Sequence, residues 1–369
     1  MRALIRFIII FLALIQSLFF WKNKKRVPKK ILIAHNLLLG DTLLLAPLMK
    51  RISEKFPKSK KYILARPAFV PFFKNLPYGF NCLSFDTKSL FDLLSIFLKG
   101  PFDQTFVIGD NRYSWLAKAL GSRWSIGISD DLPHWKNWMI DEGKPFDKTP
   151  ATWADMMARL VDGKNPEPYK KNEWARPEIQ KLSLSLDRIK PYIVCHLGAS
   201  NELRFWPYTS WQILIKGIRA KGIEVVLSAG PGEEYLIDQV DPLRCHHHVR
   251  GTFSLLEMWS LIEKSKLLIS SDTGVAHLAK VASVPTITLY GPGSPLIHGR
   301  GRFWKNSLHQ SITVDSYPCR DQNSFFRREV LWLKRCTRNT YQCKTPGACM
   351  NVISPEKVIN SFNSLLKRI

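Results

Sequence analysis

Short apolar runs that alternate with stretches of helical periodicity are the feature that most constrains the fold of this chain. In the first half we expect strands at 31–35, 62–65, 104–109 and 124–128, and helices at 41–56, 90–98 and 113–120. The same alternation returns between residues 192 and 290. Strands that alternate with helices predict parallel sheets covered by helices on both faces, so we expect an α/β chain with two doubly wound, Rossmann-like domains.

Residues 164–190 interrupt this alternation with three prolines, many charges and no apolar period, which is typical of a linker. We therefore expect a first domain over residues 31–175 and a second over 176–350. A terminal helix over 351–369 is expected to pack back across the domains. The 369 residues, of which 45% are hydrophobic, suffice for two cores. Two facing sheets would place their carboxyl ends on a central cleft, where ligands bind.

The amino-terminal segment, residues 1–30, is expected to form a hydrophobic helix with a basic flank. Residues 3–21 are almost entirely apolar, and Lys22 to Lys30 follow with six Lys or Arg. A helix of this length reaches about the thickness of a bilayer core, and the basic flank favours the cytoplasmic side. We expect a membrane anchor or an interfacial helix on an anionic membrane surface, at the cytoplasmic face of the inner membrane. A helix packed on the protein's own surface and a cleaved signal peptide are the alternatives.

The net charge of +24 is concentrated at the two ends of the chain. Residues 1–30 carry +8, residues 300–369 carry +9, and the long middle carries only +7. No basic stripe with interleaved aromatic residues lies in the middle, so the charge pattern argues against a nucleic-acid partner.

Asp41 follows the first expected strand and begins a helix, next to Gly40 and Thr42. A helix N-cap explains an Asp at this position. A carboxylate that enters the cleft as a general base is the functional alternative.

A second group, Ser270 to Ala279, follows a strand and begins a helix, and it contains Asp272, Thr273, Gly274 and His277. Backbone N–H groups at a helix start favour anions, so this turn is a candidate phosphate site. His277 either donates to a phosphate or sugar oxygen or is a partly buried helix histidine.

A third group lies in the loops after residues 197 and 228. Ser200 and Arg204 occupy the first loop, where Arg204 either binds a pyrophosphate with its two-pronged guanidinium or stacks on Trp206 at the surface. Glu233 and Glu234 follow the next strand, where a carboxylate can bind a ribose hydroxyl pair or simply favour a helix start.

Together these groups resemble the ADP-heptose:lipopolysaccharide heptosyltransferases, glycosyltransferase family 9 with the GT-B fold. The resemblance runs from about Ile31 to the carboxyl terminus. It rests on four motifs in order: GDxxLxxP from Gly40 to Pro47, the GAS…RxWP loop from Gly198 to Pro207, GxxxE from Gly230 to Glu234, and DTGxxHLA from Asp272 with VPxxxLYGP from Val284.

The resemblance implies a role for each matching residue. Asp41 would be the catalytic base, with Gly40 and Thr42 on the acceptor side. Arg204 would neutralise the donor pyrophosphate, where the family commonly has Lys, and Glu234 would hold the ribose. The remaining donor-binding residues implied are Ser200, Phe253, Asp272, Thr273, Gly274 and His277.

The activity implied is an inverting, metal-independent glycosyl transfer from a nucleotide sugar, with ADP-heptose as the expected donor. The acceptor would be a lipid-linked glycan such as a lipopolysaccharide core. No cofactor and no metal are implied. A membrane-bound, non-catalytic nucleotide-sugar-binding protein of the same fold is the alternative function, as is transfer of a different sugar.

Two cysteine groups remain. Cys319, Cys336, Cys343 and Cys349 have spacings that match no common zinc site, so a metal site, a disulfide pair and free thiols all remain open. Cys245 precedes three histidines in an alternating stretch, which we interpret as a buried thiol with histidines at a strand edge.

Overall fold

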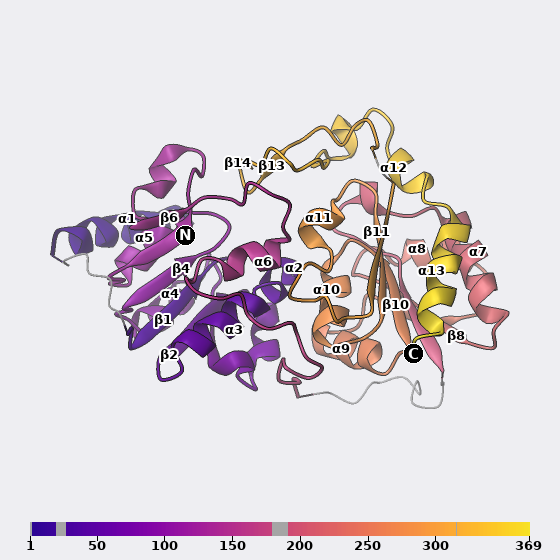
Figure 1. Cartoon of the computed structure of the whole chain (residues 1–369), viewed down its shortest axis with the longest axis horizontal. Helices are drawn as coiled ribbons and strands as arrows, with labels where there is room; N and C mark the ends of the chain where they lie inside the picture. Colours follow the sequence, from indigo (N-terminus) through magenta and orange to yellow (C-terminus); the bar gives the residue numbers. More distant parts are fainter. Residues whose placement is uncertain (1, 20–26, 179–190, 315) are drawn as a thin grey trace.

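The computed structural model describes residues 2–19, 27–178, 191–314 and 316–369, and it contains two parallel six-stranded sheets (Figure 1). The strands of the first sheet, in the order β3-β2-β1-β4-β5-β6, are β1 (Lys30–Ala34), β2 (Lys60–Ala65), β3 (Phe80–Ser84), β4 (Gln104–Val107), β5 (Ser125–Ile128) and β6 (Glu142–Lys144). The helices of this half are α1 (Arg2–Phe19), α2 (Leu39–Leu43), α3 (Ala46–Lys55), α4 (Leu90–Phe97), α5 (Tyr113–Ala119) and α6 (Trp153–Ala158).

The second sheet has the order β12-β11-β10-β7-β8-β9. Its strands are β7 (Tyr192–His196), β8 (Glu224–Ala229), β9 (His247–Arg250), β10 (Leu267–Ser271), β11 (Thr286–Tyr290) and β12 (His309–Thr313). The helices are α7 (Tyr208–Arg219), α8 (Tyr235–Val240), α9 (Leu255–Glu263), α10 (Gly274–Val281), α11 (Pro295–His298), α12 (Ala348–Asn351) and α13 (Pro355–Leu366). Counted from its own first strand, each sheet has the doubly wound order 3-2-1-4-5-6.

The expected strands and helices are present, with one instructive difference. The helix predicted over 41–56 is two helices, α2 and α3, separated by a turn at Leu44 and Leu45. Pro47 sits in the first turn of α3. Because proline has no N–H to donate, it favours a new helix start over a continued helix.

The two halves share one apolar core. A continuous cluster of buried side chains runs from α3, through Trp153 of α6, to Trp259 of α9 and Leu278 of α10. Part of the expected linker belongs to this interface: the Tyr169 hydroxyl donates to the carbonyl of Val281 at 2.6 Å, and the Trp174 indole donates to Phe72 at 3.3 Å. Residues 164–178 therefore pack between the domains, while the rest of the expected linker, residues 179–190, lies outside the described residues.

The carboxyl-terminal helix differs from its expected position. α13 packs on α7, β11 and β12 through Val358, Phe362 and Leu365, all within the second domain (Figure 1). The expectation that it packs across both domains is therefore wrong. Its serine N-cap, Ser354, accepts a hydrogen bond from the Lys357 N–H, which fixes the helix start.

Helix α1 lies against α5 on the outside of the first domain (Figure 1). Ile5 and Ala13 are buried in this contact, whereas Phe7 is 68% exposed and Leu18 is 80% exposed. This contact is the expected alternative of a helix packed on the protein's own surface. None of the helices in the described residues is both long and apolar enough to cross a membrane. The first part of the basic flank, residues 20–26, lies outside the described residues.

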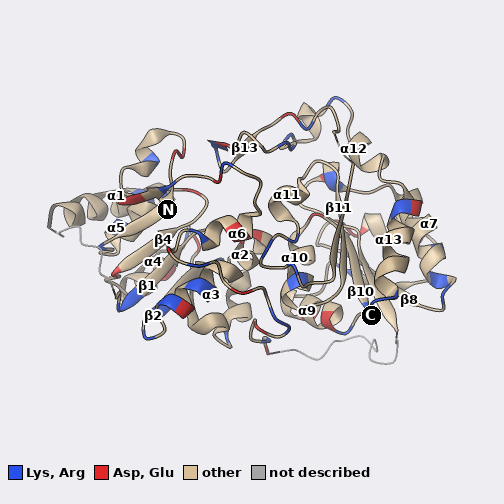
Figure 2. Cartoon of the chain, in the orientation of Figure 1, with Lys and Arg blue, Asp and Glu red and all other residues tan. Residues whose placement is uncertain are grey.

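Lys and Arg residues occur on elements of both domains, with acidic residues among them (Figure 2). Cys245, expected to be buried, is exposed just before β9, so that expectation is wrong. The nearby His248 pairs with Asp241 at 2.8 Å and serves the local fold.

Candidate functional site

A cavity of about 640 Å³ opens between the two domains, at the carboxyl ends of both sheets. The loops that line it follow β1 in the first domain and β7 and β10 in the second. These are the strands at which the strand order of each sheet reverses, the usual ligand position in such sheets. Most of the predicted site residues line this cavity: Gly40, Asp41, Ser200, Arg204, Asp272, Thr273, Gly274 and His277.

Asp41 does not cap its helix. The N-cap of α2 is Leu38, and Asp41 lies in the first helical turn with its side chain 22% exposed. Thr42 points away from the cavity, because its side chain is buried and its hydroxyl donates to the carbonyl of Leu38 at 2.9 Å. The cap interpretation of Asp41 is therefore wrong, and Thr42 has a structural role.

Gly40 lies at a close contact between the two domains. A Cβ atom at this position would lie 2.6 Å from Cδ2 of His277, and one at Gly274 would lie 3.2 Å from Cβ of Leu39. The absence of side chains at these two glycines allows α2 and α10 to touch. This contact brings Asp41 next to the loop after β10.

His298 lies between two carboxylates, and the sequence interpretation missed it. Its Nε2 is 3.6 Å from Oδ1 of Asp41, and its Nδ1 is 3.7 Å from Oδ2 of Asp272. The imidazole thus connects the first domain's acid to the second domain's acid. Its position at the end of α11, after β11, was the only available signal, and His298 lies outside the four motifs.

Lys280 supports the turn that carries His298. Its buried ammonium donates to the carbonyls of His298 at 2.6 Å and Gly299 at 2.9 Å. Burial lowers the pKa of Lys280 to about 7, with the opposing effect of Asp272 smaller. From the sequence, Lys280 is simply a lysine in the last turn of an expected helix, and nothing there indicates that it is buried.

Of the three arginines that line the cavity, Arg204 and Arg335 are close enough to repel each other. Nη1 of Arg204 donates to the carbonyl of Asp272 at 2.7 Å, so Arg204 lies in the cleft and not on Trp206. Arg335, which sequence reasoning missed, lines the same cavity. Burial lowers the pKa of Arg335, and the positive charge of Arg204 lowers it further. Two cations that repel each other in one cavity favour an anionic ligand.

The start of α10 carries buried polar atoms that are not satisfied within the described residues. These are Oδ2 of Asp272, Oγ1 of Thr273 and Nδ1 of His277. Buried polar atoms in proteins are nearly always hydrogen-bonded, so a cluster of exceptions in a cavity indicates a ligand site. Burial, followed by the nearby charge of Lys280, holds the pKa of His277 well below its usual range, so the ring is neutral.

Glu234 and Phe253 lie apart from these residues and do not line the cavity. Glu234 accepts from the N–H of Gly232 at 3.0 Å, and Phe253 packs against the shared core. Glu233 has the structural role: its carboxylate accepts from the N–H of Ala199 at 3.0 Å and of Gly230 at 2.9 Å. It thereby joins the loops after β7 and β8.

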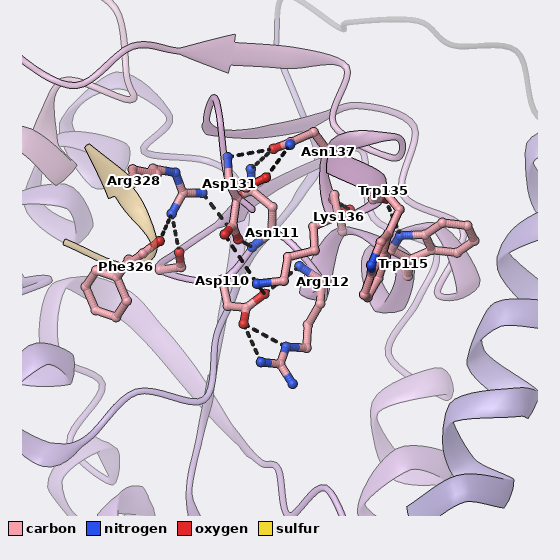
Figure 3. Close-up of polar contacts among 12 residues, drawn as sticks. Asp110, Asn111, Arg112, Trp115, Asp131, Trp135, Lys136, Asn137, Phe326 and Arg328 are labelled. Carbon is pink, nitrogen blue, oxygen red and sulfur yellow. Dashed lines mark hydrogen bonds and ion pairs between the residues drawn. The ribbon is translucent and has the colours of Figure 1, made fainter. Parts of the chain in front are cut away.

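A short hairpin from the second domain reaches the first and closes one side of the cavity (Figure 1). It consists of β13 (Ser324–Phe325) and β14 (Arg328–Glu329), and φ is positive at both turn residues, 47° at Phe326 and 60° at Arg327. Type I′ turns require this geometry. The buried Arg328 donates to the carbonyls of Gly109 at 2.7 Å and Ile128 at 3.0 Å, in the first domain (Figure 3).

The four carboxyl-terminal cysteines are free thiols in the structure, and Cys336 and Cys349 are buried. In the described part of the chain, no group of three or more His, Cys, Asp or Glu residues is arranged to hold a metal ion. The pKa of Cys319 is raised by burial and by the nearby Cys336 and Cys343 thiols.

Comparison with known proteins gives a consistent result. The family model described as Glycosyltransferase family 9 (heptosyltransferase) matches residues 109–328, more than half of the chain. Lipopolysaccharide heptosyltransferase 3 of Escherichia coli is 22% identical over 316 residues, covering 77% of this chain and 89% of that protein. Lipopolysaccharide heptosyltransferase 1 of Salmonella typhimurium is 32% identical over 114 residues, covering 30% of this chain and 36% of that protein.

Solved structures share the fold. A glycosyl transferase family 9 protein from Veillonella parvula has a TM-score of 0.73 at 19% identity, covering 94% of this chain and all of that one (100%). E. coli ADP-heptose lps heptosyltransferase II has a TM-score of 0.68 at 16% identity, covering 92% of this chain and 99% of that one. At these identities the likeness concerns the two-domain GT-B arrangement alone.

Proposed function

Because this glycosyltransferase belongs to glycosyltransferase family 9, we propose that it transfers heptose from ADP-heptose to a lipopolysaccharide core or a related lipid-linked glycan. The names of the similar proteins, lipopolysaccharide heptosyltransferases 1 and 3, support heptose transfer to this class of acceptor. The ADP-heptose donor is supported by the name of a structural neighbour, E. coli ADP-heptose lps heptosyltransferase II. The observation that carries the proposal is the single cavity in which Asp41 faces the anion-binding loops of the other domain.

The proposed reaction is an inverting displacement. Asp41 takes the proton from an acceptor hydroxyl, whose oxygen attacks the anomeric carbon as the bond to the diphosphate breaks. Arg204, Arg335 and the start of α10 meet the charge that develops on the leaving nucleoside diphosphate. In this proposal guanidinium groups supply the positive charge, so the transfer proceeds without a metal ion.

His298 has a positioning role in this reaction. It lies within 4 Å of both Asp41 and Asp272, at 3.6 Å and 3.7 Å. A ring between the two acids orients the Asp41 carboxylate and separates it from the negative charge of Asp272. Ser200, Thr273, Gly274 and neutral His277 complete the donor side, while Glu234 and Phe253 are proposed to contact the ribose and the base at its edge.

We place the reaction at the cytoplasmic face of the inner membrane. The outward face of α1 carries exposed Leu4, Phe7, Phe11 and Leu18. An apolar helix face followed by a basic segment favours shallow binding to an anionic membrane surface.

A donor panel tests the function. The purified protein is mixed with ADP-heptose and with GDP- and UDP-sugars, and the melting temperature is measured. The expected result is a shift with ADP-heptose that exceeds all others, followed by heptose transfer to a heptose-deficient core glycolipid. A shift without any transfer would indicate the non-catalytic binding protein, and a larger shift with another nucleotide sugar would replace the donor.

A further inference from the structure

A second cavity, of about 580 Å³, lies beside the cleft and has no assigned role. It is bounded by α1 and α5 and by the loops at the carboxyl end of the first sheet. Its walls are mainly apolar and come from Ile9 and Ile10 of α1, Trp115 and Leu116 of α5, Phe85 and Trp135. Trp115 and Trp135 stand side by side, and the Trp115 indole donates to the carbonyl of Trp135 at 3.3 Å (Figure 3).

Four cations border this apolar space: Arg6, Arg112, Lys136 and Arg327. Arg112 and Lys136 are held in place by Asp110, with Arg112 Nε at 2.7 Å and Lys136 Nζ at 3.2 Å (Figure 3). Arg6 and Arg327 are exposed and pair with no carboxylate among the described residues. The rim of the cavity therefore has two positive charges, those of Arg6 and Arg327, that no carboxylate in the described residues neutralises.

The cavity adjoins the cleft. Arg327 lines both, from the tip of the β13–β14 hairpin. Asn36 lines the second cavity and belongs to the same loop that leads to Asp41. A non-glycine residue in the left-handed region costs about 1 kcal/mol or more, so the fold holds Arg327 at this junction against a conformational cost.

We propose that this second cavity binds an anionic amphiphile, with a hydrocarbon chain between α1 and α5 and a phosphate group at Arg6 and Arg327. Charge complementarity and a mainly apolar wall favour one occupant with both properties, which a free phosphate or a neutral lipid lacks. That this amphiphile is the lipid-proximal part of the acceptor rests on the proposed function. The binding itself does not.

The experiment measures binding of dodecyl phosphate to the full chain by calorimetry, below the concentration at which it forms micelles. Dodecyl maltoside, with a neutral head, and inorganic phosphate are the comparison probes. We expect dodecyl phosphate to bind at least tenfold more tightly than either. Affinity should fall about fourfold for each methylene removed from the buried part of the chain.

Matched variants locate the site. Ile10→Asp and Phe11→Asp make the same change at neighbouring positions of α1, but only Ile10 lines the cavity. Arg6→Glu and Lys58→Glu make the same charge change, with Lys58 exposed just before β2, at the amino-terminal end of the strands, whereas the cavity lies at their carboxyl ends. Ile10→Asp and Arg6→Glu should each weaken binding at least tenfold, and the two controls less than twofold.

Several outcomes overturn the proposal. Equal loss in Ile10→Asp and Phe11→Asp would mean adsorption to the outer face of α1. Equal binding of dodecyl maltoside would mean detergent adsorption, and equal binding of inorganic phosphate would mean an anion site without a chain. The shift in melting temperature with ADP-heptose, measured on the same samples, separates the two proposals. If ADP-heptose gives no shift, the proposed function is refuted. If ADP-heptose gives a shift but dodecyl phosphate does not bind, only the amphiphile site is refuted.

Discussion

The two domains have the same strand order, but the loops where that order reverses are built in opposite ways. In the second domain, Asp272, Thr273 and His277 keep buried polar atoms unsatisfied within the described residues, next to two repelling guanidinium groups. In the first domain the charged groups of the corresponding loop, after β4, are paired with one another: Asp110 binds Arg112, and Lys136 lies 3.2 Å from both Asp110 and Asp131 (Figure 3). Oδ1 of Asn111 is the side-chain atom of this loop that has no partner among the described residues.

This difference indicates a division of work between the domains. Unsatisfied polar groups destabilise an empty site, and a complementary ligand that forms hydrogen bonds with them restores the lost stability. A satisfied network gains little from a ligand, but it holds nearby groups still. The second domain is thus built to bind a charged molecule, and the first to hold Asp41 and the hairpin in fixed positions.

The largest expected effect is on the group that the first domain holds in place. Asp41→Asn should lower the transfer rate by about 10²–10⁴, because the amide cannot accept the proton of the acceptor hydroxyl. Binding of ADP, measured by calorimetry, should stay within twofold of wild type, since Asp41 belongs to the opposite domain. Near wild-type turnover at saturating donor would refute the base assignment.

The satisfied network predicts a loss of stability. Arg328→Met should lower the free energy of unfolding by about 3–5 kcal/mol, because it leaves the carbonyls of Gly109, Ile128 and Ser129 without their buried donor. It also removes one of the two buried cations next to Asp131, which keeps Lys136. Urea unfolding measures the change.

Arg176→Met is the matched control for that network, since Arg176 also bridges the two halves but pairs with Glu263 at the surface. Surface ion pairs contribute about 0–1 kcal/mol, so the control should unfold nearly as wild type does. If both variants lose a similar amount of unfolding free energy, burial of Arg328 does not strengthen its contribution to stability.

The unsatisfied side predicts an effect on donor affinity. Arg335→Ala and Arg204→Ala should each weaken ADP binding by about 1.5–3 kcal/mol, the usual contribution of hydrogen bonds to charged groups, or roughly tenfold to 100-fold. Arg302→Ala removes an exposed arginine outside the cleft lining and should change nothing. Unchanged ADP affinity in Arg335→Ala would leave Arg204 as the only phosphate-binding arginine of the two.

The smallest effect per residue concerns acid. Burial lowers the pKa of His35 to about 3 and of His196 to about 4, and it holds those of His277 and His309 well below their usual range. Below pH 6.5 these histidines bind protons in the unfolded chain but not in the folded protein. The free energy of unfolding therefore falls as pH falls. At pH 5.5 each ring accounts for about 1.4 kcal/mol of the loss.

Three of these four histidines belong to the second domain, so acid should loosen that domain first. Hydrogen exchange at pH 7 and pH 5.5 should show a larger loss of amide protection in β7, β10 and β12 than in β1 and β4. Both ring nitrogens of His309 lack a partner in the described structure, so His309→Phe should fold and remove one ring's share of the acid sensitivity. Equal loss in the two domains would contradict this.

The sequence predicted the residues that directly follow regular strands. Asp272 directly follows β10, and Asp41 and Arg204 lie in the segments between β1 or β7 and the next long helix. Parallel strands bring such positions to one edge. Residues at strand ends can therefore be assigned to the cleft from the sequence, even when the contacts between distant parts of the chain are not known.

The residues that sequence reasoning missed depend on the path of irregular chain. His298 lies after a turn held by a buried lysine, and Arg328 and Arg335 belong to a segment with little regular structure between β12 and α12. Their positions follow from packing against the other domain, which no local period encodes. For Glu234 the error is of the opposite kind: the sequence predicted a site residue that does not line the cavity. Its neighbour Glu233 makes the hydrogen bonds that join the two loops.

The β13–β14 hairpin changes which parts of the chain can move as rigid bodies. The backbone passes from the first sheet to the second between β6 and β7, returns to the first domain at Arg328, and leaves it again before α12. Two bodies joined by three tethers have fewer allowed rotations than two joined by one. If the cleft opens for ADP release while Arg328 keeps its buried contacts, the hairpin travels with the first domain, and the bending falls in the segments on either side of it.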